Sequence, residues 1–287
     1  MRWRQGTRSG NIEDRRSLRG PGGAAGGVGL IGLIAIIIIG MAFGMDPMEL
    51  LSSTDFSTGF TEYQSQLTEE EQNQLADHVS LVLGSTELVW TDIFRNEHRD
   101  TYTKPKLVLF TGRVDSACGL ASSATGPFYC PADQKVYLDL DFFHELQQRF
   151  GAPGDFAQAY VIAHEIGHHV QNLDGTLQQV TRKQSRVSET EANKYSIALE
   201  LQADCYSGVW ANQAAKQDLI LDKEDIIEGL NAASAIGDDR LQQEAQGYVV
   251  PDSFTHGTSA QRVSWFRKGM ESGDIDACDC LNQIDNL

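Results

Sequence analysis

Apolar residues recur every three to four positions over most of the second half of the chain, which is the spacing of helices with one buried face. Helices are expected there over about 156–172, 190–213, 222–235 and 259–269. In the first half, Thr68-Glu-Glu-Glu71 is a capping box, a pattern that satisfies the first free amides of a helix. It predicts a helix of about four turns after Thr68, and a second helix is expected over 85–97.

Two segments between these helices are rich in residues that favour strands. They span 106–113 and 135–143, and the loop between them contains Pro127 and Pro131. We expect the two segments to form a hairpin-like pair. The chain from residue 67 onward is therefore predicted to be one α+β domain that is mostly helical and carries a small β hairpin or sheet.

The apolar run over 28–45 contains no charged residue. Because roughly 17–25 apolar residues are needed to cross a bilayer, we expect one transmembrane helix there. A cleaved signal peptide is the alternative, but its apolar region is usually about 7–15 residues long, and no A-x-A-like cleavage site follows Ile39. The arginines before the run predict a cytoplasmic N-terminus and a domain outside the cytoplasm from Asp46 onward.

These patterns divide the chain into four predicted parts. They are a basic, Gly-rich, disordered cytoplasmic tail (1–27), the transmembrane helix (28–45), a tether (46–66) and the folded domain (67–287). The chain has 23 lysines and arginines against 40 aspartates and glutamates, a net charge of −17. Because nucleic-acid binding depends on a basic surface, nucleic acid is not expected as a partner.

The chain has 5 cysteines, which suit an oxidising compartment where disulfides form. Cys118 and Cys130 flank a loop rich in glycine and serine and could close it. Cys205 could pair with Cys278 or Cys280, which would tie the C-terminus to a helix. Buried free thiols are one alternative. A cysteine-rich zinc site is another, although no histidine lies near Cys278 and Cys280 in the sequence.

His164-Glu-Ile-Gly-His168 carries the clearest chemistry in the chain. Two histidines four residues apart lie on one face of a helix, so both imidazoles can reach a single metal ion. H-E-x-x-H is the zinc signature of metalloproteases, so zinc is the expected cofactor. Glu165 is the expected general base, which takes a proton from water and later delivers it to the leaving amine. A glutamate on the helix surface is the alternative.

A catalytic zinc usually has three protein ligands and leaves a fourth position to water. Glu200 and Asp204 are the best candidates to complete the site, because they are four residues apart and lie on one helix face. One carboxylate can bind the metal while the other accepts a hydrogen bond from the far nitrogen of a ligand histidine. A solvated acidic face is the alternative, although the flanking residues are mostly apolar.

His256 and Arg262 lie in a polar stretch near the C-terminus. Attack on a peptide carbonyl creates an oxyanion, and a second donor beside the metal helps to stabilise it. Either side chain could reach the cleft from the start of the last predicted helix. A helix cap formed by Thr258 or Ser259, with Arg262 in a structural ion pair, agrees with the residues equally well.

Several motifs together are more specific than the five-residue zinc signature. They are Met1-Arg-Trp-Arg4 with Glu13-Asp-Arg-Arg16, Gly126-Pro-Phe-Tyr-Cys-Pro131, Val136-Tyr-Leu-Asp139, His164-Glu-Ile-Gly-His-His169, Glu200-Leu-Gln-Ala-Asp-Cys205 and Phe254-Thr-His-Gly257 with Ala260-Gln-Arg262. With them the chain resembles the bacterial family of putative neutral zinc metallopeptidases (YpfJ-like), over almost its whole length. That family is similar to the gluzincins, in which a glutamate and an aspartate one turn later complete the site.

The resemblance implies a zincin-like fold and a role for each candidate residue. It implies Glu200 as the third zinc ligand and Asp204 as the hydrogen-bond partner of His164. It also implies a transition-state role for His256 and Arg262. The family pattern has one cysteine near the end, which favours Cys278 over Cys280 as the partner of Cys205.

We therefore predict a membrane-anchored zinc metallopeptidase that hydrolyses peptide bonds in extended peptides or unfolded protein segments. Such a substrate is expected to pair with an edge strand from 106–113 or 136–143. The alternative is a non-catalytic zinc-binding envelope protein of the same fold that acts as a binding or scaffold module, with a fourth side chain closing the site. Hydrolysis of another amide, such as a cell-wall peptide, would use the same chemistry.

Overall fold

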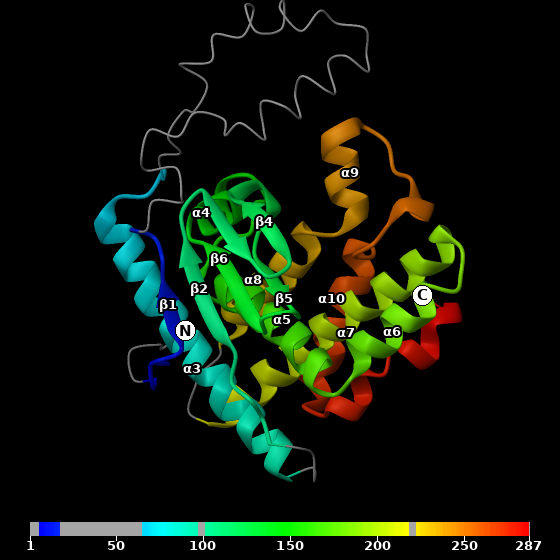
Figure 1. The fold of residues 1–287 in the computed structure, drawn as a ribbon, viewed down its shortest axis with the longest axis horizontal. Helices are drawn as coiled ribbons and strands as arrows, with labels where there is room; N and C mark the ends of the chain where they lie inside the picture. Colours follow the sequence, from blue (N-terminus) through cyan, green and yellow to red (C-terminus); the bar gives the residue numbers. More distant parts are fainter. Residues whose placement is uncertain (1–5, 18–64, 97–100, 218–221, 287) are drawn as a thin grey trace, which may run out of the picture.

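The computed structural model describes residues 6–17, 65–96, 101–217 and 222–286 (Figure 1). Its longest helices are α3 (Glu69–Asn96), α5 (Asp155–Leu173) and α7 (Glu189–Lys216). The shorter helices are α4 (Asp141–Gln148), α6 (Thr176–Gln184), α8 (Lys223–Ala235), α9 (Asp238–Gln246) and α10 (Ser259–Ser272). The predicted helices over 156–172, 190–213, 222–235 and 259–269 correspond to α5, α7, α8 and α10.

The strands form two small sheets. One sheet has the order β1-β2-β6-β5, with bounds Ile12–Asp14, Lys106–Phe110, Lys135–Asp139 and Phe128–Cys130. β1 and β6 both run parallel to β2, whereas β5 runs antiparallel to β6. The other sheet is the antiparallel pair of β3 (Arg113–Ser116) and β4 (Gly119–Ser122). The mostly helical α+β prediction for the folded domain therefore agrees with the structure.

The predicted hairpin of 106–113 and 135–143 is wrong. Its two strands, β2 and β6, are neighbours but run parallel, with Leu107 opposite Val136. Parallel neighbours need a long crossover, and here the intervening residues form the β3–β4 hairpin and β5. Both predicted edge strands are also interior strands, because β2 lies between β1 and β6, and β6 lies between β2 and β5.

The two helices predicted over 68–97 are one continuous helix, α3. Gly84 lies in its middle and does not interrupt it. A Cβ atom at this position would lie 2.0 Å from the carbonyl oxygen of Thr7. The glycine therefore allows the N-terminal segment to cross α3 closely.

Residues 6–17 belong to the folded domain. β1 pairs with β2, with Ile12 opposite Leu107. The amide of Ser9 also donates a hydrogen bond of 2.9 Å to the carbonyl oxygen of Ser80 on α3. The predicted disordered tail over 1–27 is corrected for these residues, because backbone pairing holds them on the sheet and on α3.

The pairing of β1 also corrects the predicted membrane topology. The segment 28–45 lies outside the described residues, as does most of the predicted tether over 46–66, and no described helix is long and apolar enough to cross a bilayer. β1 precedes that segment and β2 follows it, yet the two strands share backbone hydrogen bonds. A chain that crossed the membrane once between them would put these strands on opposite sides. The predicted single-pass protein with a cytoplasmic N-terminus and an extracytoplasmic domain is therefore wrong.

The N-terminal segment contributes to stability through Glu87 of α3, which is only 5% exposed. Its carboxylate accepts hydrogen bonds from Ser9 Oγ at 2.5 Å and from Asn11 Nδ2 at 2.7 Å. Hydrogen bonds to a charged group contribute about 1.5–3 kcal/mol each, so replacing Ser9 and Asn11 together by alanine is expected to lower the free energy of unfolding by about 3 kcal/mol. Urea unfolding measures the change.

The matched control is Arg8→Ala, which removes an ion pair with Asp77 whose side chains are 49% and 50% exposed. Its expected cost is below about 1 kcal/mol. Equal losses in the control and in the double variant would contradict the structural role assigned to the segment.

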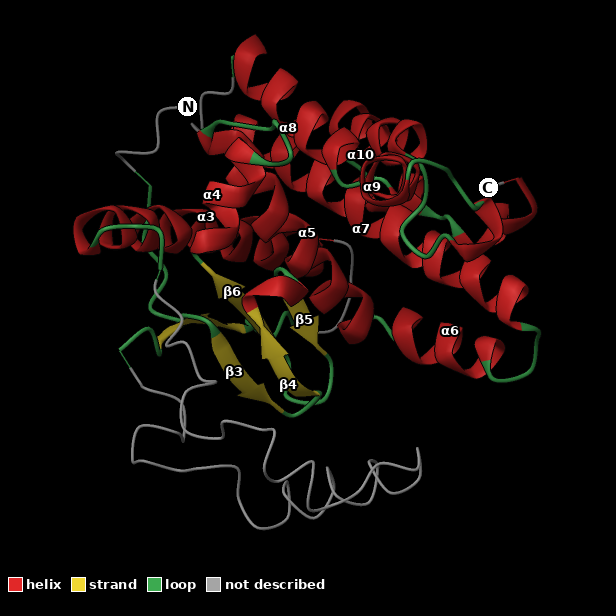
Figure 2. Ribbon diagram, turned by 90° about the horizontal axis from the view of Figure 1, so that it is seen from above, coloured by secondary structure: helices red, strands yellow, loops and turns green. Residues whose placement is uncertain are grey.

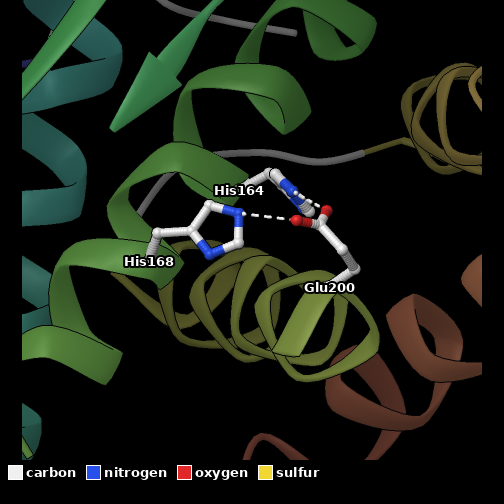
Figure 3. Close-up of side chains that lie close together, drawn as sticks. All are labelled: His164, His168 and Glu200. Atoms are coloured by element: carbon white, nitrogen blue, oxygen red, sulfur yellow. Dashed lines mark hydrogen bonds and ion pairs between the residues drawn. The ribbon is translucent and has the colours of Figure 1, made fainter. Parts of the chain in front are cut away.

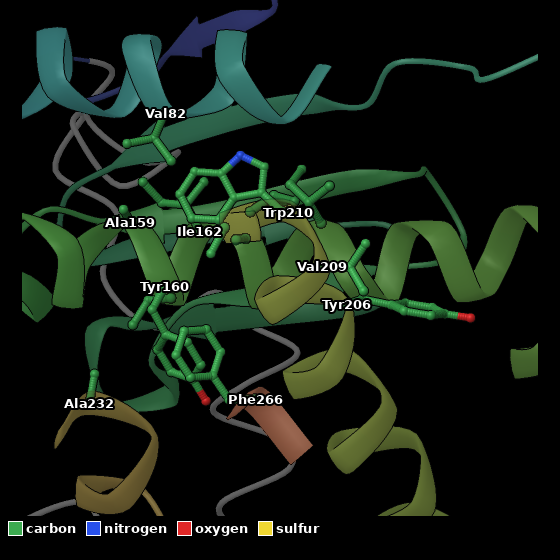
Figure 4. Packing of buried hydrophobic residues seen from close by; sticks show 14 of the residues in the cluster. Val82, Ala159, Tyr160, Ile162, Tyr206, Val209, Trp210, Ala232 and Phe266 are labelled. Atoms are coloured by element: carbon green, nitrogen blue, oxygen red, sulfur yellow. The ribbon is translucent and has the colours of Figure 1, made fainter. Parts of the chain in front are cut away.

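α5 lies between the four-stranded sheet and the helices α7, α8 and α10 (Figure 2). Figure 4 shows the core on this helical side, where Trp210 of α7 is fully buried among side chains of α3 and α5. Its ring stacks on the ring of Phe156 of α5, with 5.9 Å between the ring centroids. Its Nε1 donates a hydrogen bond to Ser85 Oγ of α3 at 3.1 Å. This packing fixes α5 and α7 side by side, and both helices carry the candidate site.

Candidate metal centre

Three side chains meet where α5 and α7 pack together: His164, His168 and Glu200 (Figure 3). Nε2 of His164 lies 3.1 Å from Glu200 Oε2, and Nε2 of His168 lies 3.4 Å from Glu200 Oε1. Their potential ligand atoms are all within 4.8 Å of one another. Within the ranges the structure describes, no other group of three or more histidine, cysteine or carboxylate side chains meets this condition.

These separations fit a zinc ion. Two ligands of a tetrahedral zinc, each bonded at about 2.0–2.1 Å, are roughly 3.3 Å apart. The two contacts of Glu200 with the histidines bracket that separation. Two imidazoles and one carboxylate are also the donor set of a known class of catalytic zinc site. The residues therefore fit the metal in both spacing and chemistry.

Gly167, inside the motif, allows α7 to come this close to α5. A Cβ at position 167 would lie 3.1 Å from both Cα and O of Ala203, which is tighter than ordinary contacts. Ala203 is three residues beyond Glu200, so the close approach brings that turn of α7 against the histidine face of α5. A larger residue at position 167 would push the carboxylate of Glu200 away from the imidazoles.

His164 is held from behind by Asp204. Nδ1 of His164 lies 2.9 Å from Asp204 Oδ1, which leaves Nε2 directed toward Glu200. Asp204 is fully buried and also accepts a hydrogen bond from the hydroxyl of Tyr160. Arg262 donates to both oxygens of Asp204, from Nε and from NH2, at 2.9 Å each. The carboxylate is thus saturated and can act only by fixing and orienting His164.

Arg262 lies on the Nδ1 side of His164, with its NH2 3.4 Å from that nitrogen. Its side chain is 2% exposed and lies behind His164, in contact with Asp204 and the hydroxyl of Tyr160. Its NH2 also lies 3.9 Å from Oε2 of Glu200, and the transition-state role of Arg262 stays a prediction. Of the two alternatives that the residues left open, the placement agrees with the structural ion pair.

The electrostatic environment of the centre attracts positive charge. Burial lowers the pKa of His164, but the carboxylates of Asp204 and Glu200 outweigh burial and raise it to about 10. Burial also raises the pKa of Glu200, yet the two histidines reverse this and lower it well below its ordinary value. Glu200 is therefore an anion that stabilises positive charge beside it, and a divalent cation would displace the proton of His164 on binding.

His168 has a partner that the sequence analysis missed. Its Nδ1 lies 2.9 Å from Oε1 of Gln171, one turn further along α5. Gln171 is fully buried. The spacing of three residues puts both side chains on one helix face, but nothing in the sequence distinguishes this glutamine from one that points into solvent.

Glu165 follows the first ligand on α5 and is 8% exposed. With respect to the residues that the structure describes, its carboxylate has no hydrogen bond or ion pair. Its negative charge contributes to raising the pKa of His168, so it lies near the centre. A buried carboxylate without a protein partner is available to water or substrate.

His256 is held near the centre by Asp238 at the start of α9. Its Nδ1 lies 3.1 Å from Asp238 Oδ1, and the backbone amides of Thr255, His256 and Gly257 donate to Asp238 Oδ2. The hydrogen bond to Asp238 raises the pKa of His256 against the opposing effect of burial, and the charge of Glu200 adds to the rise. The sequence analysis singled out His256 but not Asp238, which comes from another helix.

Comparison with known proteins agrees with this geometry. A family model described as "Putative neutral zinc metallopeptidase" matches residues 1–281. The chain belongs to this family. It is 46% identical over 292 residues, 99% of each chain, to "Uncharacterized protein YpfJ" of Escherichia coli (strain K12). It is also 39% identical over 261 residues to "Uncharacterized protein Rv2575" of Mycobacterium tuberculosis (strain ATCC 25618 / H37Rv), covering 85% of this chain and 86% of that protein. No solved structure matches the chain.

The resemblance predicted from the motifs is thus confirmed, and this member of the zinc metallopeptidase family has both predicted disulfides. Cys118 is bonded to Cys130, and Cys205 is bonded to Cys278. Cys280 is the remaining thiol and is buried. The first disulfide links the β3–β4 hairpin to β5, and the second ties the residues after α10 to the ligand-bearing helix α7.

In this metallopeptidase family member His169, next to the candidate ligand His168, connects α5 with β5. Its Nδ1 lies 3.0 Å from the hydroxyl of Tyr129, and its Nε2 lies 2.6 Å from the carbonyl oxygen of Thr103. Burial lowers the pKa of His169 to about 4, so the ring is neutral near pH 7. It therefore serves as a structural link between the ligand-bearing helix and the edge of the sheet.

Proposed function

We propose that the protein is a zinc-dependent peptidase. One observation carries the proposal: the His164, His168 and Glu200 side chains have the spacing of zinc ligands, in a chain of a zinc metallopeptidase family. Zinc bound there would supply Lewis-acid chemistry, lowering the pKa of water to about 7 and polarising a carbonyl group.

The protein residues would supply proton transfer, stabilisation of the oxyanion and positioning of the ligands. Glu165 accepts a proton from the attacking water and delivers it to the nitrogen of the leaving amine as the C–N bond breaks. Its carboxylate has no partner among the described residues, which supports this role. His256, oriented by Asp238, which also raises its pKa, donates a hydrogen bond to the oxyanion that develops on the carbonyl oxygen. Arg262 and Asp204 hold His164 in place.

The substrate class we propose is an extended peptide or an unfolded protein segment. Since β2 and β6 are interior strands, the edge strands of this sheet are β1 and β5, and β5 is the one proposed for pairing. β5 has β6 on one side only, and His169 links it to the ligand-bearing helix. An extended chain that added to this edge would make backbone hydrogen bonds and therefore tolerate many sequences.

A non-catalytic protein with structural zinc is the alternative. Structural zinc is closed by four protein ligands, which leaves no position for water. The cluster contains three such side chains among the described residues, which favours an open, catalytic site.

The direct test is cleavage of a random peptide library by the full-length, zinc-loaded protein, read by mass spectrometry. We expect new termini that disappear on chelation of zinc and return when zinc is restored. A zinc-loaded protein that cleaves nothing in the library would contradict the proposed function.

The raised pKa of His256 leads to a prediction about pH dependence. Because Asp238 stabilises the imidazolium, wild-type His256 stays cationic to higher pH than an ordinary histidine. Asp238→Asn removes that charge, lowers the pKa of His256 and should move the alkaline limb of kcat/KM to lower pH.

The control is Asp239→Asn, the adjacent residue, which accepts hydrogen bonds from Ser259 and not from His256. It should leave the alkaline limb where it is. An unchanged limb in Asp238→Asn would show that His256 does not take part as a cation.

A further inference from the structure

Behind His168, a chain of buried amides runs from α5 through α7 to the C-terminal segment. Gln171 Oε1 lies 2.9 Å from Nδ1 of His168. Nε2 of Gln171 donates to the carbonyl oxygen of Leu199 at 2.7 Å and to Oε1 of Gln202 at 3.0 Å. Nε2 of Gln202 donates to the carbonyl oxygen of Cys278 at 3.2 Å. Gln171 is fully buried and Gln202 is 7% exposed.

Two backbone carbonyls fix the direction of this chain. The carbonyl oxygen of Cys278 can only accept, so Gln202 must turn its NH2 group toward it and its oxygen toward Gln171. The carbonyl oxygen of Leu199 likewise can only accept, so Gln171 must present its NH2 group there. The oxygen of Gln171 is then the atom that faces His168.

An amide oxygen beside an imidazole determines the tautomer of the ring. In the neutral form that binds a metal, His168 must carry its proton on Nδ1 to donate to Gln171, which leaves the lone pair of Nε2 free for the metal on the side of Glu200. Asp204 does the same for His164. The two histidines thus present the same nitrogen to the centre, one through a carboxylate and the other through a neutral amide.

The far end of the amide chain is anchored covalently. Cys278 forms a disulfide with Cys205 of α7, so its carbonyl cannot move away from the helix that carries Gln202. One end of the amide chain is thus fixed to α7 at both Gln202 and Cys205. Its other end holds the imidazole of His168 on α5. Such an arrangement orients a ligand before the metal arrives.

We propose that Gln171 and Gln202 are positioning residues that fix the tautomer and orientation of His168 for metal binding. The inference rests on the proposed metal site and adds two residues to it. Removing a hydrogen-bond partner of a metal-bound histidine typically weakens metal binding about 10–100-fold. Gln202 acts one step further away, through Gln171, so its loss should weaken binding less.

The test measures zinc affinity of the full-length protein by competition with a chromogenic chelator, so it does not depend on peptidase activity. Gln171→Met keeps the side-chain volume and removes the acceptor, and should raise the zinc dissociation constant about 10–100-fold. Gln202→Met should raise it less. The double variant should be no weaker than Gln171→Met alone, because both changes act along one path. The cobalt-loaded forms should show altered ligand-field spectra in the same order.

Gln213→Met is the matched control. Gln213 also lies on α7 and donates to a backbone carbonyl of the C-terminal segment, that of Gly273, at 2.6 Å, but it has no contact with Gln171. It should lose stability in urea without any change in zinc affinity or in the cobalt spectrum. If Gln171→Met fails to fold, the zinc dissociation constants of Gln202→Met and Gln213→Met are compared instead.

Two results would overturn the inference. One is a dissociation constant within twofold of wild type, with an unchanged cobalt spectrum, in both Gln171→Met and Gln202→Met. The other is an equal loss of zinc affinity in Gln213→Met, which would indicate a general effect of loosened packing. A wild-type protein that binds no zinc would instead contradict the proposed function, and a zinc-binding protein without peptidase activity would leave the positioning role intact.

Discussion

Glu165→Gln is expected to lower kcat for peptide hydrolysis by about 10³-fold, while the zinc content stays at one ion per chain. Glutamine has the shape of glutamate but cannot accept a proton from water or deliver one to the leaving amine. Glu165 is also not one of the three side chains that converge on the centre, so zinc binding should survive. Cleavage of a fluorogenic peptide and elemental analysis of the same samples measure both quantities.

The control is Glu191→Gln on α7, whose exposed side chain pairs with Lys194. It should retain full activity. A Glu165→Gln protein with wild-type kcat would remove Glu165 from the reaction, and one that loses zinc would mean that Glu165 is itself a ligand.

Arg262→Met is expected to lower the free energy of unfolding of the metal-free protein by about 4 kcal/mol. The substitution leaves the fully buried Asp204 carboxylate without the guanidinium that donates to both of its oxygens, and removing one partner of a buried ion pair is costly. Because Asp204 also orients His164, zinc affinity should fall in the same variant. Urea unfolding and chelator competition measure the two effects.

The control for Arg262 is Arg95→Met, which removes an ion pair with Asp92 whose side chains are 69% and 46% exposed. Its cost should lie within about 0.5 kcal/mol. If Arg262→Met loses no more stability than this control, the buried ion pair between Arg262 and Asp204 does not stabilise the fold around His164.

The metal cluster was predictable because its parts have local spacing. His164 and His168 are four residues apart on one helix, and so are Glu200 and Asp204, so the periodicity of the helix alone puts each pair on one face. That the two faces meet was inferred from the apolar residues around the acidic pair, and the resemblance then assigned the role of each carboxylate. The close approach at Gly167 explains physically why they can meet.

Most contacts that support the site could not be predicted, because their two partners lie far apart in the sequence. Asp238 of α9 holds His256 across 18 positions of sequence, and Arg262 reaches Asp204 across 58. Gln171 is close to His168 in the sequence, but buried glutamines have no pattern that separates them from exposed ones. The buried place of Arg262 depends on how α10 packs against α7, which periodicity does not specify.

The strand order and the N-terminal segment were missed for a related reason. Strand composition identified β2 and β6, but whether neighbours run parallel depends on what lies between them. β1 has 3 residues in a basic stretch and becomes a strand only through its pairing with β2. The apolar run after it suggested a single membrane crossing, and the backbone pairing of β1 with β2 is what excludes that arrangement.

Zinc-edge X-ray absorption on the purified full-length protein tests the three-ligand centre most directly. We expect one zinc per chain with only nitrogen and oxygen neighbours, at about 2.0–2.2 Å, and an oxygen from water among them. In a Glu200→Ala sample the bound zinc should be lost or its spectrum should change. A wild-type spectrum with sulfur at about 2.3 Å, or a Glu200→Ala protein with unchanged zinc content and spectrum, would contradict the centre formed by His164, His168 and Glu200.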